Sequence, residues 1–219
     1  MKVAIAGAGA VGRSIARELI GNGHDVLLVD KEPGKITPDR IPGATWLLGD
    51  ACEVANLEEA SFEEFDVVIG ATGDDKVNLV VSLLAKTEFS VQRVVARINH
   101  PSNEWLFTEA WGVDRAVSTP RVLASIVEEA VTVGDVVQLF SIREGQANLV
   151  ELTLPEGAPI EGRTVRAIEL PRDVTLVAIV RGDRVITPTP EDTLEAGDEL
   201  LFLALPEAEA AIHAAVLGG

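Results

Sequence analysis

Hydrophobic and polar positions follow two different periods along residues 1–118. Short apolar runs recur roughly every 20 to 25 residues, and stretches with helical periodicity lie between them. This alternation predicts strand–helix–strand units and therefore a parallel sheet. The expected strands are Val3–Ala6, Val26–Val29, Thr45–Leu48, Val67–Gly70, Val94–Ile98 and Ala116–Val117.

Apolar residues three and four positions apart predict the helices between these strands. Each set lies on one face of its helix, which is the face expected to pack on the sheet. The sets are Val11, Ile15, Leu19 and Ile20 in the first helix, Val77, Val80, Val81 and Leu84 in a second, and Trp105, Leu106 and Ala110 in a further one.

The pattern changes after Val117. Thr119-Pro120 predicts the start of a helix that continues through Val131, because proline is favoured at the first helical position. We interpret residues 119–135 as a connecting helix with an apolar stripe that needs a partner surface. The stripe consists of Val122, Ile126, Val127 and Ala130.

Residues 136–219 show the pattern of a small α+β domain, with strand-like runs separated by turn signals. Arg181-Gly182-Asp183-Arg184 predicts a tight hairpin, and Pro206 opens a short helix expected to end at Val216. The expected strands are Val136–Ile142, Leu149–Leu154, Leu176–Arg181, Arg184–Ile186 and Glu199–Leu205.

Composition narrows the class of protein. The chain has 219 residues, of which 47% are hydrophobic and 24% charged, as in a soluble globular protein. No secretory leader opens it and no apolar run is long enough to span a bilayer, so we expect a cytoplasmic location. The formal charge of −17 argues against nucleic-acid binding and suits a basic partner. The single cysteine, Cys52, can form neither an internal disulfide nor a zinc site.

A glycine-rich turn is the strongest local signal. Gly7-Ala8-Gly9-Ala10-Val11-Gly12 follows a predicted strand and opens a helix. Gly7 permits the tight turn, Gly9 lets the backbone approach a pyrophosphate, and Gly12 lets the helix lie close to the strand. Free amides at the helix start favour the phosphates. The first 118 residues are therefore predicted to form a Rossmann-type, doubly wound α/β domain.

An acidic residue ends the second strand. Asp30 can accept hydrogen bonds from both ribose hydroxyls and would repel a 2′-phosphate. It therefore favours NAD, ATP, ADP or AMP over NADP. Lys31 is expected beside it, either at the ligand or as a solvated lysine.

Further polar residues follow the later strands. Because ligands of open parallel sheets bind beyond the carboxyl ends of the strands, these residues should share one crevice. Asp50 and Ala51 are expected at the adenine, and Thr72 and Gly73 at the ribose and phosphates. Asp74 suits either the pocket or a helix N-cap.

Two arginines could pair with phosphate oxygens. Arg97, at the end of the fifth strand, is the better candidate, and Arg13, at the start of the first helix, is the second. For both, a surface salt bridge is the alternative.

The sequence offers no catalytic constellation. It contains no tyrosine, and its three histidines, His24, His100 and His213, have no acidic or metal-binding partners at suitable spacing. This pattern favours binding over catalysis, with no metal site.

With these residues in place, the chain resembles the regulator-of-potassium-conductance (RCK) family, specifically the cytosolic TrkA/KtrA-type subunits of bacterial potassium uptake systems. The run from Val165 to Leu203 resembles the family's small C-terminal domain. The N-terminal resemblance is carried by Lys2 to Gly12, Asp30, Gly49-Asp50-Ala51, Ala71-Thr72-Gly73-Asp74-Asp75 with Asn78, and Ala96-Arg97-Ile98-Asn99.

The resemblance implies a regulatory subunit that is not an enzyme. Its N-terminal domains would assemble, as a homo-oligomer or with a related subunit, into a gating ring at the inner face of the cell membrane beneath a potassium-translocating subunit. Bound NAD(H), ADP, ATP or AMP would change the shape of the ring. The C-terminal domain binds cyclic di-AMP in some members. The expected nucleotide-binding residues are Gly7, Gly9, Ala10, Val11, Gly12, Asp30, Lys31, Asp50, Ala51, Thr72, Gly73, Asn78 and Arg97.

Two positions depart from the family pattern. Ala10 stands where some members have an arginine that reaches the terminal phosphate of ATP, and Arg121 stands where some have a glutamate that helps to bind a divalent cation. NAD(H), ADP or AMP is therefore favoured over ATP with a metal. Two alternatives remain: a nucleotide-sensing regulator of a cation/proton antiporter, and a small NAD-dependent oxidoreductase.

Overall fold

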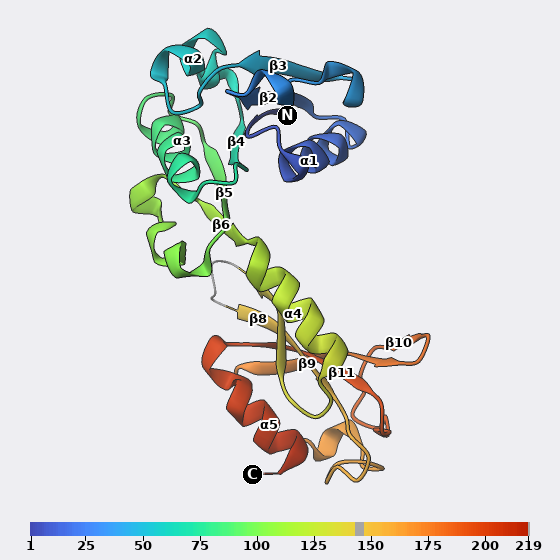
Figure 1. The fold of residues 1–219 in the computed structure, drawn as a ribbon. Helices are drawn as coiled ribbons and strands as arrows, with labels where there is room; N and C mark the ends of the chain where they lie inside the picture. Colours follow the sequence, from blue (N-terminus) through green and yellow to red (C-terminus); the bar gives the residue numbers. More distant parts are fainter. Residues whose placement is uncertain (143–146, 219) are drawn as a thin grey trace. The chain divides into compact units, whose positions relative to one another are not determined.

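The computed structural model describes residues 1–142 and 147–218 (Figure 1). The chain divides into two compact units, Met1–Pro120 and Arg121–Gly219. Each unit has its own sheet and its own hydrophobic core.

A parallel six-stranded sheet forms the first unit, with the order β3-β2-β1-β4-β5-β6. The order reverses between β1 and β4, which creates the topological switch point of a Rossmann-type sheet. The predicted α/β class is thus confirmed. The strands are β1 (Lys2–Ala6), β2 (Asp25–Asp30), β3 (Ala44–Leu48), β4 (Val67–Gly70), β5 (Arg93–Ile98) and β6 (Arg115–Ser118).

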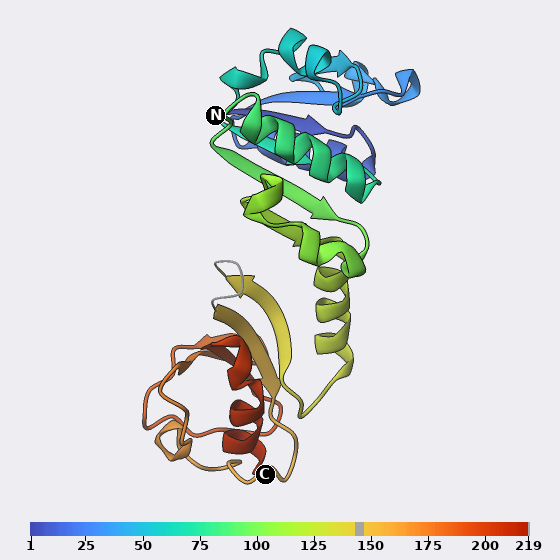
Figure 2. The same ribbon diagram turned by 90° about the vertical axis from the view of Figure 1, so that its left-hand side faces the viewer.

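Helices cover both faces of this sheet. They are α1 (Ala10–Gly21), α2 (Val54–Glu59) and α3 (Asp75–Thr87). Figures 1 and 2 show α1 on one face and α2 and α3 on the other. Neighbouring strand residues point to opposite faces, so Val3 and Ile5 pack in the same cluster as Ala16 of α1, whereas Ala4 and Ala6 pack with α2 and α3.

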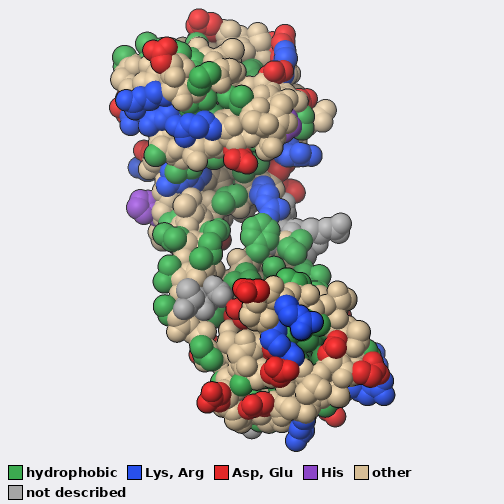
Figure 3. Space-filling model, turned by 90° about the vertical axis from the view of Figure 1, so that its right-hand side faces the viewer, with side chains coloured by type: hydrophobic (Ala, Val, Ile, Leu, Met, Phe, Trp, Pro, Cys, Tyr) green, Lys and Arg blue, Asp and Glu red, His purple; other side chains and the backbone are tan. Residues whose placement is uncertain are grey.

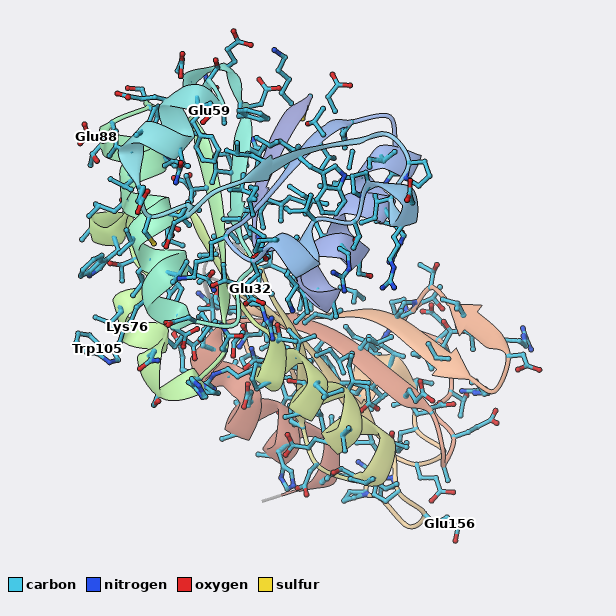
Figure 4. The ribbon with its side chains drawn as sticks, turned by 45° about the horizontal axis from the view of Figure 1, so that its top comes forward. Glu32, Glu59, Lys76, Glu88, Trp105 and Glu156 are labelled. Atoms are coloured by element: carbon cyan, nitrogen blue, oxygen red, sulfur yellow. The ribbon has the colours of Figure 1, made fainter. Side chains whose placement is uncertain are left out.

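The helix predicted around Trp105 is wrong. This segment forms two short 3₁₀ turns, η4 (Pro101–Leu106) and η5 (Glu109–Trp111). Gly112 ends it with φ +73°, and a Cβ there would lie 2.6 Å from the carbonyl oxygen of Ser82, so the chain turns sharply where a longer helix would continue. Trp105 is 75% exposed and points outward in Figure 4.

Four further segments are short. A helix that the periodicity did not predict, α2, has six residues. The turns η1 (Pro33–Lys35) and η2 (Pro38–Arg40) follow β2, and η3 (Phe62–Glu64) precedes β4.

An antiparallel sheet forms the second unit, with the order β10-β9-β11-β8-β7. Helix α5 (Glu209–Leu217) packs on it through Ile212 and Val216. The predicted start of this helix at Pro206 is instead a 3₁₀ turn, η7 (Pro206–Ala208), and η6 (Val165–Ala167) lies in the loop before β9. The strands are β7 (Val137–Ile142), β8 (Ala147–Thr153), β9 (Val174–Arg181), β10 (Arg184–Ile186) and β11 (Glu199–Ala204).

One arginine fixes the loop before β11. The Nε and Nη2 atoms of Arg181 donate to the two carboxylate oxygens of Asp198 at 2.6 and 2.7 Å, and Nη2 also donates to the Thr193 carbonyl at 2.7 Å. Asp198 is fully buried. The bidentate bond compensates the buried carboxylate and ties the end of β9 to this loop.

Helix α4 (Thr119–Val131) has the bounds that the sequence predicts. Ile126 is 55% exposed, Val127 53% and the neighbouring Leu123 63%, so these described side chains on α4 are largely exposed. The side chain of Ala130, its predicted fourth member, lies outside the described residues. Figure 3 shows hydrophobic side chains at the surface where α4 runs. Among the described residues, no helix is long and apolar enough to cross a membrane.

Candidate nucleotide-binding site

A cavity of about 620 Å³ lies at the carboxyl ends of the first unit's parallel strands. The loops after β1, β2, β3 and β4 and the end of β5 line it, as expected for a ligand site at a topological switch point. Its volume is typical of a small-molecule site. The predicted residues that line it are Gly7, Gly9, Ala10, Val11, Asp30, Lys31, Asp50, Ala51, Thr72, Gly73 and Arg97.

The glycine-rich turn packs tightly on one side and is open on the other. Gly7 has φ +105°, and a Cβ there would lie 2.9 Å from the Thr72 backbone. A Cβ on Gly12 would lie 1.9 Å from the Gly7 carbonyl oxygen, so Gly12 supports the turn from outside the cavity. Gly9 is the N-cap of α1, and no atom beyond its chain neighbours lies within 4 Å of its Cβ position.

The start of α1 therefore faces open space. The first amides of a helix have no carbonyl partner within the helix, and the helix dipole adds a partial positive charge there. Gly9, Ala10 and Val11 line the cavity at this point. Backbone amides in such a position suit an anion such as phosphate.

The carboxylate of Asp30 is held in place by the backbone. Its Oδ2 accepts the Ala8 N–H at 2.8 Å, and its Oδ1 accepts the Glu32 N–H at 2.9 Å. Each oxygen keeps acceptor capacity for a further bond. Asp30 thus fixes the glycine turn, and its two oxygens are oriented at the cavity.

An ion pair lies at the ends of β2 and β3. Lys31 Nζ lies 3.3 Å from Asp50 Oδ2, and Asp50 Oδ1 accepts the Cys52 N–H at 3.0 Å. The Cys52 amide and Lys31 lower the pKa of Asp50 despite its partial burial. The Asp50 carboxylate is therefore held ionised and oriented by these two partners.

A hydrogen-bond network holds the loop after β4. Asn78 Oδ1 accepts the Thr72 backbone N–H at 2.9 Å and its hydroxyl at 2.7 Å, while Asn78 Nδ2 donates to the Arg97 carbonyl at 2.8 Å. Asn99 Nδ2 donates to the Thr72 carbonyl at 3.0 Å. Asn78 is fully buried and does not line the cavity, so it positions Thr72 and Arg97.

Asp75, which the sequence reasoning did not assign, anchors the start of α3. Its carboxylate accepts hydrogen bonds from the Asn99 and His100 backbone amides and from the Asn99 and Asn103 side chains, at 2.7 to 3.1 Å. Burial raises its pKa, but these four bonds outweigh burial and the net pKa is lowered. Asp75 ties the cavity loop to the segment after β5.

Other cavity residues were also missed by sequence reasoning. Val29, Glu32, Lys35, Ala71 and Val77 line the cavity. Figure 4 labels Glu32 in the loop after β2. Val29, Glu32 and Ala71 lie at or shortly after predicted strand ends, which could have signalled them. Lys35 and Val77 lie further along the chain, in η1 and α3, where no such signal exists.

Asp74 has both of the roles that the sequence left open. It lines the cavity, and its Oδ1 accepts the Lys76 N–H at 2.9 Å as the N-cap of α3. Arg13 does not line the cavity; its guanidinium donates to the Ala8 carbonyl at 2.6 Å and so supports the glycine turn.

The described residues offer little reactive chemistry. Burial, followed by the nearby Asp50, raises the pKa of Cys52 to about 11, so its thiol is not a nucleophile at neutral pH. Within residues 1–142 and 147–218, no group of three His, Cys, Asp or Glu side chains could hold a metal ion. The cavity thus combines the open start of α1 with polar and charged side chains from the loops after the strands.

Two protein families match the chain. The TrkA-N domain family matches residues 3–119, and the TrkA-C domain family matches residues 149–216. The Trk system potassium uptake protein TrkA of Mycobacterium tuberculosis is 64% identical over 95% of both chains. A TrkA homolog of Methanothermobacter thermautotrophicus is 30% identical, also over 95% of both chains.

Solved structures share the fold. The GsuK channel bound to NAD matches 100% of this chain and 39% of its own, with a TM-score of 0.71 and 18% identity. A structure of GsuK bound to ADP matches 58% of this chain and 33% of its own, with a TM-score of 0.52 and 28% identity.

Proposed function

The chain belongs to the TrkA family of Trk system potassium uptake proteins, and on this premise we propose that it regulates potassium transport by binding an adenine nucleotide in the cavity of its first unit. It is a regulatory subunit rather than an enzyme. Nucleotide binding in this account changes the assembly that the subunit forms, and that assembly gates a potassium-translocating membrane subunit.

One observation carries the proposal. The open start of α1, the carboxylate of Asp30 and the guanidinium of Arg97 all line one cavity. The phosphates of an adenine nucleotide suit the start of α1 and Arg97, and its ribose hydroxyls suit the Asp30 carboxylate. No catalytic group is needed for this arrangement to act as a sensor.

The cavity favours nucleotides with a free 2′-hydroxyl. Asp30 and Glu32 bring two acidic side chains to the end of β2, where a 2′-phosphate would meet repulsion. The similar structures bound to NAD and to ADP support the same class of ligand. NAD(H), ADP and AMP are the proposed ligands. ATP is expected to bind without the help of a dedicated metal site.

Assembly is the second part of the proposal. The exposed apolar stripe of α4 exceeds what a solvated linker needs, and such patches usually mark interfaces. We expect dimers or larger rings in solution, and multi-angle light scattering measures this directly. A monomer at micromolar concentration would contradict the gating assembly while leaving nucleotide binding intact.

The transport function is tested in cells that lack this chain. Uptake of rubidium, a potassium substitute, should be restored by the wild-type protein and impaired by Gly9→Ala, which narrows the cavity at the phosphate position. The matched control is Gly21→Ala, at the far end of the same helix, where the added Cβ also meets nothing within 4 Å. Equal uptake with both variants would contradict nucleotide control. Unchanged uptake in the cells without the chain, together with NADH oxidation by the purified protein, would favour an oxidoreductase.

A further inference from the structure

Arg97 contacts both the cavity and the beginning of the connecting helix. Arg97 is one of the residues that line the cavity, and its Nε donates to the hydroxyl of Thr119 at 3.2 Å. Thr119 is the first residue of α4. No other cavity-lining residue described in the structure forms a hydrogen bond with Thr119.

The two residues are brought together by strand pairing. In the parallel pair β5–β6, Arg97 lies opposite Val117 and Ile98 opposite Ser118, and Thr119 follows directly. The Arg97 backbone is fixed from the other side, because its carbonyl accepts Asn78 Nδ2 at 2.8 Å. The guanidinium is thus the variable part of an otherwise fixed residue.

The charge of Arg97 has no carboxylate partner among the described residues. Its Nε is used by Thr119, which leaves the four N–H groups of Nη1 and Nη2 for another acceptor. An unpaired guanidinium with this free edge in a cavity suits the oxygens of a phosphate, which it can bind through two parallel bonds.

We propose that Thr119 is a positioning residue, which orients Arg97 for a nucleotide phosphate and so couples nucleotide binding to the first turn of α4. The inference rests on the proposed nucleotide site and adds its route to the helix. A phosphate bound at Nη1 and Nη2 restrains the guanidinium, and the restrained guanidinium holds Thr119. By reciprocity, the Thr119 hydroxyl must strengthen phosphate binding by the same factor.

The expected factor is modest. The Arg97–Thr119 bond is solvent-exposed and at the long end of the hydrogen-bond range, so its loss should change affinity by about two- to tenfold. The effect should require a phosphate on the ligand. A ligand without one cannot benefit from an oriented Arg97.

The test compares Thr119→Val, which removes the hydroxyl at nearly constant size, with Thr119→Ser, which keeps it. Thr87→Val is the matched control, because it removes an exposed hydroxyl that donates to the Leu83 carbonyl at 3.0 Å near the end of α3. Calorimetry of the full chain measures the affinity for ADP and, by competition, the affinity for adenosine. The difference between the two gives the part of the binding free energy that depends on phosphate. Hydrogen exchange of residues 119–131 with and without ADP reports on α4.

Thr119→Val should weaken ADP about two- to tenfold and leave adenosine unchanged, and ADP should no longer increase the protection of α4. Thr119→Ser and Thr87→Val should behave as the wild type. A general loss of helix stability would change α4 exchange equally with and without ADP, and that result would overturn the coupling. Unchanged ADP affinity in Thr119→Val, or equal losses for ADP and adenosine, would also overturn it while leaving the nucleotide site standing. Failure of the wild type to bind ADP would overturn the site and the coupling together.

Discussion

Two glycines in the turn after β1 should respond to the same substitution in opposite ways. Gly12→Ala places a methyl group 1.9 Å from the Gly7 carbonyl oxygen, far inside van der Waals contact. Gly9→Ala places it in open space at the cavity, where nothing lies within 4 Å. The first change should damage the fold of the turn, and the second should damage only ligand binding.

The magnitudes follow from these contacts. The methyl group added by Gly12→Ala meets backbone atoms, which cannot rotate away. This overpacking should lower the free energy of unfolding by about 3 kcal/mol or more. Gly9 has φ −72° and ψ −170°, a conformation open to alanine. The loss of a glycine N-cap is offset by a less flexible unfolded chain, so stability should change by less than about 1 kcal/mol. ADP should bind Gly9→Ala at least about tenfold more weakly, or about 1.4 kcal/mol.

Tryptophan fluorescence measures the stability of the first unit alone. All three tryptophans, Trp46, Trp105 and Trp111, lie in Met1–Pro120, so a urea transition followed by their emission reports on that unit. Calorimetry gives the ADP affinity, with Gly21→Ala as the control for adding a methyl group to α1. Wild-type stability in Gly12→Ala would refute the close packing of the turn. Wild-type ADP affinity in Gly9→Ala would refute the placement of the phosphates.

The remaining predictions concern the carboxylates of Asp30 and Asp75, the effect of magnesium on ATP binding, and Arg181. Asp30→Ala should weaken ADP by about 1–3 kcal/mol in calorimetry, because ribose hydroxyls and the Ala8 amide lose their acceptor; an unchanged affinity would exclude Asp30 from the site. ATP and ADP should bind within about tenfold of each other, about 1.4 kcal/mol, with little dependence on magnesium; a hundredfold, magnesium-dependent preference for ATP would contradict this. Folding lowers the pKa of Asp75, so its ionised carboxylate stabilises the protein above the ordinary pKa of 3.8, and this stabilisation is lost as pH falls through the lower folded value. The difference in unfolding free energy between wild type and Asp75→Asn, followed by tryptophan emission, should therefore shrink below about pH 4, and a constant difference would refute this. Arg181→Leu should destabilise the second unit by about 1–3 kcal/mol in calorimetric unfolding, since it leaves the buried carboxylate of Asp198 without its charged partner, while the tryptophan transition stays unchanged.

The local sequence pattern was sufficient to predict features that depend on a single strand, helix or turn. The strands of the first sheet lie within two residues of their predicted bounds, because buried parallel strands show as short apolar runs. The glycine turn could be interpreted from spacing, since the close packing of a single turn requires glycine at Gly7 and Gly12. Residues directly after strand ends, such as Asp50 and Thr72, were expected in one crevice because parallel strands end at one edge of the sheet.

Long-range contacts could not be predicted in this way. Asp75 is anchored by Asn99, His100 and Asn103 from a loop 24 to 28 residues away, and no local pattern marks such partners. The segment around Trp105 has helical spacing but forms two 3₁₀ turns, and the sharp turn at Gly112 ends the second of them. Glu32 reaches the cavity because the chain turns after β2, which hydrophobic periodicity does not show.

The central claim is that the first unit binds an adenine nucleotide through an unmodified ribose. The most direct test is titration calorimetry of the full-length protein with NAD and with NADP under identical conditions. The account predicts one NAD site per chain and at least about tenfold weaker NADP binding, a difference of about 1.4 kcal/mol, because Asp30 and Glu32 line the end of β2. Equal affinities for the two dinucleotides, or no binding of NAD, ADP or AMP, would contradict it.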